Sequence, residues 1–304
     1  MCPGLAFLPN RAILILMSFS EKQFTSINSQ GLHRIVYNDW GPRDGFPVIC
    51  VHGLTGNGHD FDFLAEELIR DGYRIIAVDL PGRGRSDFLP SPHDYNYKQY
   101  FHDIMGLLAH LGVGGPASVD WIGISLGGLL GIYLAGLKDT PIRRMVINDV
   151  GPEVPKKALD FIHQVISQSY TFDTVHALEK RMRATRGLTW GPVTDDQWRH
   201  MAEHNARALD GGQITYAYDP EIAVVFESQP IGDVDLWPFW DSIACPLLVL
   251  QGKQSVILTG DILKKMDERG PSFDLHVFKG CGHVPSLMAP DQIDVVRKWL
   301  DNKS

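Results

Sequence analysis

Short runs of hydrophobic residues mark the first half of the chain, and the runs are bounded by glycine, proline or polar residues. They are too brief for helices, and uninterrupted apolar runs of this length are typical of strands buried on both faces of a parallel sheet. Between them, apolar residues recur at intervals of three and four, as on one face of a helix. The predicted strands span residues 47–51, 74–78, 119–124 and 145–147, and the predicted helices lie within 61–68 and 97–111.

An antiparallel hairpin is predicted ahead of this alternation. In residues 24–28 and 32–38, apolar and polar side chains alternate, and β-branched residues are frequent. Ser29, Gln30 and Gly31 form the turn between the two predicted strands. Strands that alternate with helices predict an α/β fold with a mostly parallel, doubly wound sheet.

The alternation stops at Gly151. Helical segments and tryptophans follow as far as residue 240, with no strong strand, and strands then resume at 246–250 and 273–278. A final helix carries three apolar residues on one face, at Ile293, Val296 and Leu300. We therefore predict an N-terminal extension at 1–20, a core at 21–150, a helical cap insertion at 151–240 and a second core part at 241–304.

Charge and cysteine content narrow the function classes. The 304 residues carry a net charge of −8, which argues against broad binding to nucleic acids or anionic membranes. The four cysteines include no C-x-x-C pair, so they suggest neither a zinc site nor a disulfide framework, and a reducing, cytoplasmic location is expected. The apolar stretch at residues 12–17 is too short to span a bilayer. We expect a monomer or homodimer that acts on a small molecule, without stable membrane insertion.

The most informative motif is the sequence G-I-S-L-G, which places Ser125 between a predicted strand and a predicted helix. A serine at so sharp a turn projects its hydroxyl out of the fold, and the flanking glycines avoid clashes. The N-terminus of the following helix can stabilise negative charge. The simpler interpretation of this motif is a glycine-rich turn without a catalytic role. Only partner residues elsewhere in the chain can distinguish the two interpretations.

Two further loops follow predicted strands and carry suitable partners. After the strand at 47–51, the N–H of Leu54 can face a reacting carbonyl, and the N–H of Leu126 supplies a second donor, so that together they form an oxyanion hole. His283 follows the last strand and lies behind two glycines. An imidazole there can accept the serine proton and later deliver it to the leaving group.

These motifs, in their order along the chain, resemble those of the α/β-hydrolase superfamily. The resemblance extends from about residue 24 to the end of the chain. The loop at 79–86 is also similar to the family's loop after the second buried strand, where its expected role is structural. The resemblance implies Ser125 as nucleophile, His283 as base and a cap over the pocket, with no cofactor and no metal.

The acid of the triad departs from the family's common pattern. In the family it usually follows the next-to-last strand, but residues 251–258 contain no carboxylate, and Asp261 is the first one downstream. Asp149 ends the fourth buried strand on the same sheet edge as Ser125, and we predict it as the acid that orients His283. The alternatives are that Asp149 only bonds to loop backbone, or that Asp261 is the acid.

The predicted cap carries candidates for substrate recognition. An arginine turned inward would clamp a substrate carboxylate, whereas a solvated basic face is the simpler interpretation for at least two of the three arginines. Aromatic residues there would line the cavity or simply form core. The arginines are Arg181, Arg183 and Arg186, and the aromatic residues are Trp190, Trp198, Tyr216 and Tyr218.

The combined prediction is a cofactor-free serine hydrolase that cleaves a small ester through an acyl-enzyme. The first alternative is hydrolysis of a carbon–carbon or carbon–nitrogen bond in a carboxylate-bearing catabolite. The second is a ligand-binding relative with weak turnover, which the missing carboxylate at 251–258 motivates. Fold alone does not choose among them.

Overall fold

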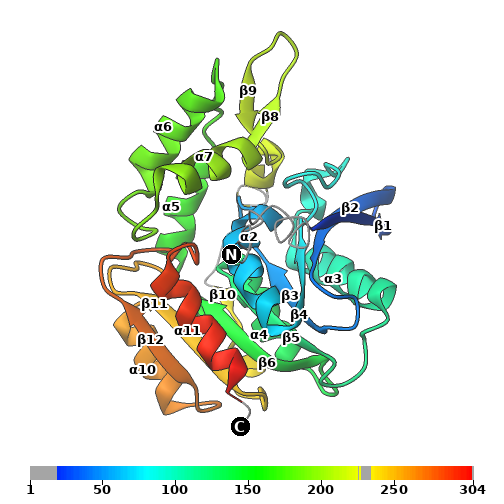
Figure 1. Ribbon diagram of the computed structural model, residues 1–304, viewed down its shortest axis with the longest axis vertical. Coiled ribbons are helices and arrows are strands. Elements are labelled where there is room, and N and C mark those ends of the chain that lie inside the picture. The colour runs from blue at the N-terminus through cyan, green and yellow to red at the C-terminus, as the bar shows by residue number, and fades with distance from the viewer. Residues whose placement is uncertain (1–18, 225, 227–233, 303–304) are drawn as a thin grey trace, which may run out of the picture.

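A twisted sheet of eight strands forms the centre of the molecule (Figure 1). The computed structural model describes residues 19–224, 226 and 234–302. The first three strands in spatial order pair antiparallel, and the other neighbouring strands pair parallel. In that order the strands are β1 (Ser20–Asn28), β2 (Gly31–Trp40), β4 (Tyr73–Val78), β3 (Phe46–Val51), β5 (Val119–Ile124), β6 (Ile142–Asn148), β11 (Leu247–Gly252) and β12 (Asp274–Phe278).

Helices cover both faces of this sheet, as the uninterrupted apolar runs predict. Along β3, Ile49 and Val51 belong to one buried cluster, whereas Val48 and Cys50 belong to the other. The doubly wound α/β fold is therefore confirmed, with an antiparallel hairpin at one edge. The first cluster is covered by α3 (Tyr97–Leu111), α4 (Leu126–Ala135), α9 (Trp237–Trp240) and α10 (Gly260–Glu268), and the second by α2 (Asp62–Leu68) and α11 (Pro290–Asp301).

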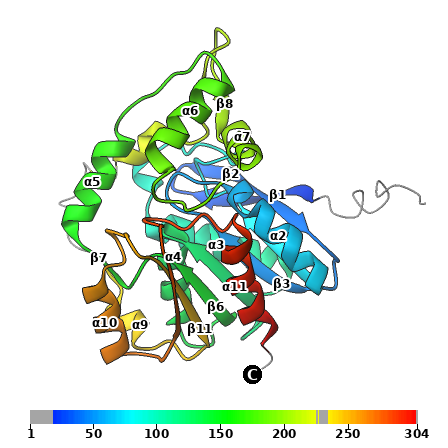
Figure 2. The ribbon, with the colours of Figure 1, turned by 60° about the vertical axis from the view of Figure 1, so that its left-hand side comes forward.

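Residues 156–223 form a second body of structure, here called the helical segment, which lies over one end of the sheet (Figure 2). Two of its helices, α6 and α7, begin at threonine caps: the Thr174 side chain accepts from the N–H of Ala177, and Thr194 forms a capping box with Gln197. A third small hydrophobic cluster, which includes Met182, lies mainly in this segment and is completed by Met288 and Phe63 from the rest of the chain. Its elements are α5 (Lys156–Ile166), α6 (Val175–Arg186), α7 (Asp195–His204), β8 (Ala206–Ala208), β9 (Ile214–Tyr216) and η5 (Pro220–Ala223).

The sequence predicts no strong strand between 152 and 240, but the structure contains two small antiparallel pairs there. One joins β7 (Glu153–Val154) to β10 (Val234–Asp235), and the other joins β8 to β9. Strands of two or three residues are too short for an alternating pattern to be recognised. The described residues contain no helix that is both long and apolar enough to cross a membrane.

The predicted N-terminal extension lies outside the described residues except for its last two positions. Phe19 packs with its ring centroid 4.9 Å from that of Trp40, and β1 already begins at Ser20. The division into extension, core and cap stays a prediction.

Candidate active site

Ser125 lies at the sharp turn between β5 and α4, with a φ of 49° and a ψ of −108°. The two glycines of the motif are needed because the turn packs backbone on backbone. A Cβ at Gly123 would lie 2.3 Å from the carbonyl oxygen of Gly127, and one at Gly127 would lie 1.9 Å from that of Val51. The turn leaves Ser125 only partly buried, directly before the N-terminus of α4.

Replacing Gly127 by alanine is expected to destabilise the protein by about 3 kcal/mol, because the new methyl group meets the rigid backbone of β3. Chemical denaturation followed by circular dichroism measures this loss. Gly260→Ala is the matched control, since a Cβ at Gly260 meets no atom within 4 Å. Equal stability of the two variants would contradict the predicted packing.

The structure brings the three residues predicted as a triad together. His283 follows β12, and its Nε2 lies 3.1 Å from Ser125 Oγ, while its Nδ1 lies 2.8 Å from Asp149 Oδ2. The His283 side chain is 22% exposed, whereas that of Asp149 is fully buried. The loop that carries His283 is tied to β6, because the Asn148 side chain donates to the carbonyl oxygen of Pro285 at 2.8 Å.

Asp149 is held by the stretch in which the sequence lacks a carboxylate. The N–H of Gly252 donates to Asp149 Oδ1 at 2.8 Å, and the Ser255 hydroxyl donates to Oδ2 at 2.6 Å. The loop after β11 thus supplies hydrogen-bond donors to the acid instead of the acid itself. Asp261 lies exposed in the first turn of α10.

The loop after β3 is fixed by a neutral histidine and a buried arginine. Burial lowers the pKa of His52 to about 4. Its Nδ1–H donates to the carbonyl oxygen of Gly53 at 2.6 Å, and its Nε2 accepts from the N–H of Leu80 at 3.0 Å. Arg83 donates through Nε to the carbonyl oxygen of Leu54 at 2.9 Å. These bonds set the orientation of the peptide groups around Leu54.

Two N–H groups from different loops are the predicted donors to an oxyanion at Ser125. The N–H of Leu126 belongs to the first turn of α4, where helical N–H groups have no acceptor within the helix. Within the described part of the chain, the N–H of Leu54 forms no hydrogen bond. Among the residues that the structure describes, neither N–H group is thus engaged by an acceptor of the usual kind, and their role as oxyanion-hole donors stays a prediction.

Arg83 and Ser255 are the supporting residues that the sequence analysis missed. Arg83 is fully buried and donates through Nη1 to Pro81 O and to the Tyr100 hydroxyl, so the loop at 79–86 has the structural role that was predicted for it. The sequence does carry a signal for Arg83, because it is a charged residue that lies between two glycines just after a buried strand. No local pattern marks Ser255, because its partner lies on another strand.

The arginines of α6 differ in their partners. Arg181 donates to the Tyr170 hydroxyl at 2.7 Å, and Arg183 pairs with Glu179 at 2.6 Å. The guanidinium of Arg186 stacks 5.1 Å from the ring of Trp190 and forms no hydrogen bond or ion pair with another residue that the structure describes. The Arg186 guanidinium also lies 5.7 Å from the ring centroid of Tyr216, and its role in substrate recognition stays a prediction.

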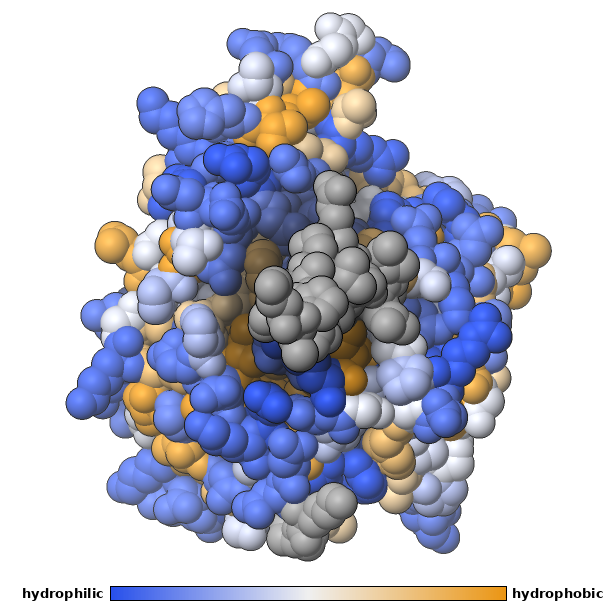
Figure 3. Space-filling model, viewed as in Figure 1, coloured by the Kyte–Doolittle hydropathy of each residue, from blue (hydrophilic) through white to orange (hydrophobic). Residues whose placement is uncertain are grey.

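Two of the four candidate aromatic residues belong to the hydrophobic cluster that lies mainly in the helical segment. Trp198 and Tyr216 are buried there, and Trp190 stacks on Trp198 with ring centroids 5.1 Å apart. The prediction that some of the four line a cavity stays a prediction. On the face shown in Figure 3, hydrophobic side chains are visible between the helical segment and the core.

The loop that ends α6 contacts the loop of His283 directly. The N–H of Gly282 donates to Thr189 O at 2.9 Å, and the N–H of Ser286 donates to Trp190 O at 3.1 Å. The turn that follows Arg186 at the end of α6 is thereby joined to the loop that carries His283.

The fold and this arrangement define an α/β-hydrolase. Residues 48–295 match the alpha/beta hydrolase family, and the chain belongs to it. It is 36% identical over 286 residues to a 3-hydroxybutyrate-oligomer hydrolase from Cupriavidus necator, covering 90% of this chain and 95% of the relative.

Two further proteins are similar over nearly the whole length. An α/β-hydrolase from Novosphingobium aromaticivorans superposes with a TM-score of 0.82 at 34% identity, covering 94% of this chain and 99% of that structure. A 2-(acetamidomethylene)succinate hydrolase from Mesorhizobium japonicum is 27% identical over 270 residues, covering 88% of this chain and 92% of the relative. The protein is accordingly a hydrolase.

Proposed function

We propose that this hydrolase is a serine esterase that acts on a small, carboxylate-bearing ester without a cofactor. The observation that carries the proposal is the continuous chain of contacts from Ser125 Oγ through His283 to Asp149, at 3.1 and 2.8 Å. This is the geometry by which a base activates a serine hydroxyl and a buried carboxylate orients the base.

Each step of the proposed reaction uses one of these groups. Ser125 Oγ attacks the ester carbonyl as His283 Nε2 takes its proton, and the N–H groups of Leu54 and Leu126 stabilise the oxyanion. Loss of one such donor costs about 2.7–4 kcal/mol in comparable enzymes. The imidazolium returns the proton to the departing alcohol, which leaves an acyl-enzyme. Water, deprotonated by His283, then releases the acid and restores Ser125.

Arg186 supports the choice of a carboxylate-bearing substrate. The carboxylate of Asp60, which packs against Gly56 of the loop after β3, interacts electrostatically with Arg186. Burial raises the pKa of Asp60 to about 7, so this carboxylate neutralises Arg186 only in part at neutral pH. A substrate carboxylate would satisfy the guanidinium by charge-assisted hydrogen bonds.

The names of two relatives agree with this choice. An oligomer of 3-hydroxybutyrate is joined by ester bonds and ends in a carboxylate, and 2-(acetamidomethylene)succinate carries two carboxylates. Hydrolysis of a carbon–nitrogen bond in such a dicarboxylate is the second candidate, which the same Arg186 and the second relative favour. The complete set of contacts at Ser125 argues against a ligand-binding protein with little turnover.

Purified protein given the dimer of 3-hydroxybutyrate tests the proposed function. We expect release of the monomer, followed by chromatography or by acid release in a pH-stat. A protein that leaves the dimer intact but hydrolyses 2-(acetamidomethylene)succinate would support the second candidate instead. A protein that hydrolyses neither, nor any small ester, would contradict both.

Arg186→Gln is expected to lower kcat/KM for the free-acid dimer by about 10–100-fold, which corresponds to the loss of a hydrogen-bonded charge pair. The methyl ester of the same dimer lacks the charge and should be hydrolysed at nearly the unchanged rate. Arg181→Gln is the matched control, because it removes an equal charge from the same helix at a position already bonded to Tyr170. If Arg186→Gln lowered kcat/KM equally for the free acid and the methyl ester, Arg186 would not be the residue that binds the substrate carboxylate.

A further inference from the structure

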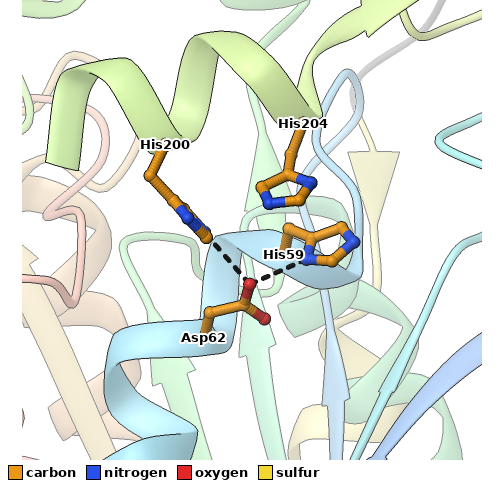
Figure 4. A group of neighbouring side chains, drawn as sticks. All are labelled: His59, Asp62, His200 and His204. Carbon is orange, nitrogen blue, oxygen red and sulfur yellow. Dashed lines mark hydrogen bonds and ion pairs between the residues drawn. The ribbon is translucent and has the colours of Figure 1, made fainter. Parts of the chain in front are cut away.

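Three histidines and one aspartate converge between the helical segment and the core, apart from the residues of the candidate active site. His59 and Asp62 come from η2 (Gly58–Phe61) and α2, and His200 and His204 lie one turn apart on α7 (Figure 4). One potential ligand atom from each of the four lies within 4.8 Å of every other. The described residues contain no second group of this kind.

The Asp62 carboxylate lies at the centre of the group. Its Oδ2 is 2.7 Å from His59 Nδ1 and 3.0 Å from His200 Nε2. Its Oδ1 is buried and has no hydrogen-bond partner among the described residues, although only 4% of Asp62 is exposed. An unsatisfied buried carboxylate oxygen is costly, so it indicates that a further ligand belongs here.

His204 is the other incompletely bonded member of the group. Its ring is stacked 3.7 Å from that of His59 and lies 4.4 Å from that of His200, and it forms no hydrogen bond to another described residue. A neutral imidazole can offer its lone pair to a cation without first losing a proton.

We propose that His59, Asp62, His200 and His204 bind one divalent transition-metal ion, with Zn²⁺ as the best match. Three imidazoles and a carboxylate are the ligand types that zinc prefers, and four ligands fill a tetrahedral shell. Because parallel stacked rings cannot both point a lone pair at the same ion, the His204 ring turns about its Cβ–Cγ bond on binding. The two hydrogen bonds to Asp62 Oδ2 are replaced by bonds to the metal.

An open cavity of about 600 Å³ gives the ion access to the group, since His59 and His204 both line it. Bound metal would join α7 to η2, which directly follows the loop of Leu54. A hydrogen bond already joins these two elements, because the side chain of Asn57, just before η2, donates to the carbonyl oxygen of His204 at the end of α7 at 3.1 Å. The ion would therefore hold the helical segment on the core and take no part in the hydrolysis itself.

Titration of the untagged full-length protein with Co²⁺, after removal of metals by a chelator, tests the proposal. We expect one equivalent to bind and to give the visible absorption of tetrahedral cobalt, which Zn²⁺ then displaces. His200→Gln and Asp62→Asn should each weaken Zn²⁺ binding by about 100-fold in competition with a chelating indicator. The control His102→Gln changes an exposed histidine of α3 and should bind as the wild type does.

Thermal unfolding provides a second measurement on the same proteins. At a hundred times the dissociation constant, Zn²⁺ should raise the Tm of the wild type and of His102→Gln by about 5 °C. The Tm of His200→Gln should not respond to the metal. Absence of a stoichiometric cobalt spectrum in the wild type, or equal binding by His200→Gln and Asp62→Asn, would overturn the proposal.

Discussion

Ser125→Ala is expected to reduce kcat for hydrolysis of a p-nitrophenyl ester by a factor on the order of 10⁶. The variant lacks the hydroxyl oxygen that lies 3.1 Å from His283 Nε2, so no acyl-enzyme can form. The proposed oxyanion-hole donors, the N–H groups of Leu54 and Leu126, remain in the variant and should leave a residual rate above that in water. Steady-state kinetics on the two purified proteins measure the difference.

Ser242→Ala is the matched control for this prediction, because Ser242 is exposed and its hydroxyl donates only to Pro238 O. Its kcat should equal that of the wild type. If Ser125→Ala retained full activity on these esters, the proposed mechanism would be wrong. Circular dichroism spectra that match between the variants exclude misfolding as the cause of a loss.

Asp149→Asn is expected to reduce kcat by about 10⁴-fold. The amide cannot stabilise the imidazolium that forms on His283, and its NH₂ group favours the wrong tautomer of the ring. Its size is nearly unchanged, so the hydrogen bonds from Gly252 and Ser255 can still reach the remaining amide oxygen in part. Kinetics with p-nitrophenyl esters at several pH values measure the loss.

Asp261→Asn is the control, and it also tests the alternative acid. Asp261 is exposed in the first turn of α10, so this variant should stay within about twofold of the wild-type rate. An active Asp149→Asn together with an inactive Asp261→Asn would reverse the assignment of the acid.

The sequence contained enough to predict the sheet and the positions of Ser125, His283 and Asp149. Uninterrupted apolar runs predict strands buried on both sides, and the G-x-S-x-G turn fits only where a strand meets a helix. Asp149 followed from its place at the end of β6, once residues 251–258 were found to contain no carboxylate.

The contacts that support these residues could not be predicted. Ser255 is bonded to Asp149 across 106 positions of the chain, and Arg83 reaches Leu54 from a different loop. No spacing rule connects such pairs, since they meet only when neighbouring strands are aligned. The short strands of the helical segment were missed because each has too few residues to show a period.

The histidine cluster was missed for a related reason. Cysteine spacing excludes one common type of zinc site and says nothing about histidines that folding brings together. His200 and His204 do show the i, i+4 spacing of a helical metal-binding pair, but their partners lie more than a hundred residues earlier.

Labelling with a fluorophosphonate, followed by mass mapping of the peptides, tests the central claim most directly. The account predicts that the native protein takes up one equivalent on Ser125, and that Asp149→Asn is labelled far more slowly because His283 is no longer oriented. Label on a different residue, or hydrolysis of esters that continues unchanged after Ser125 is fully labelled, would contradict it.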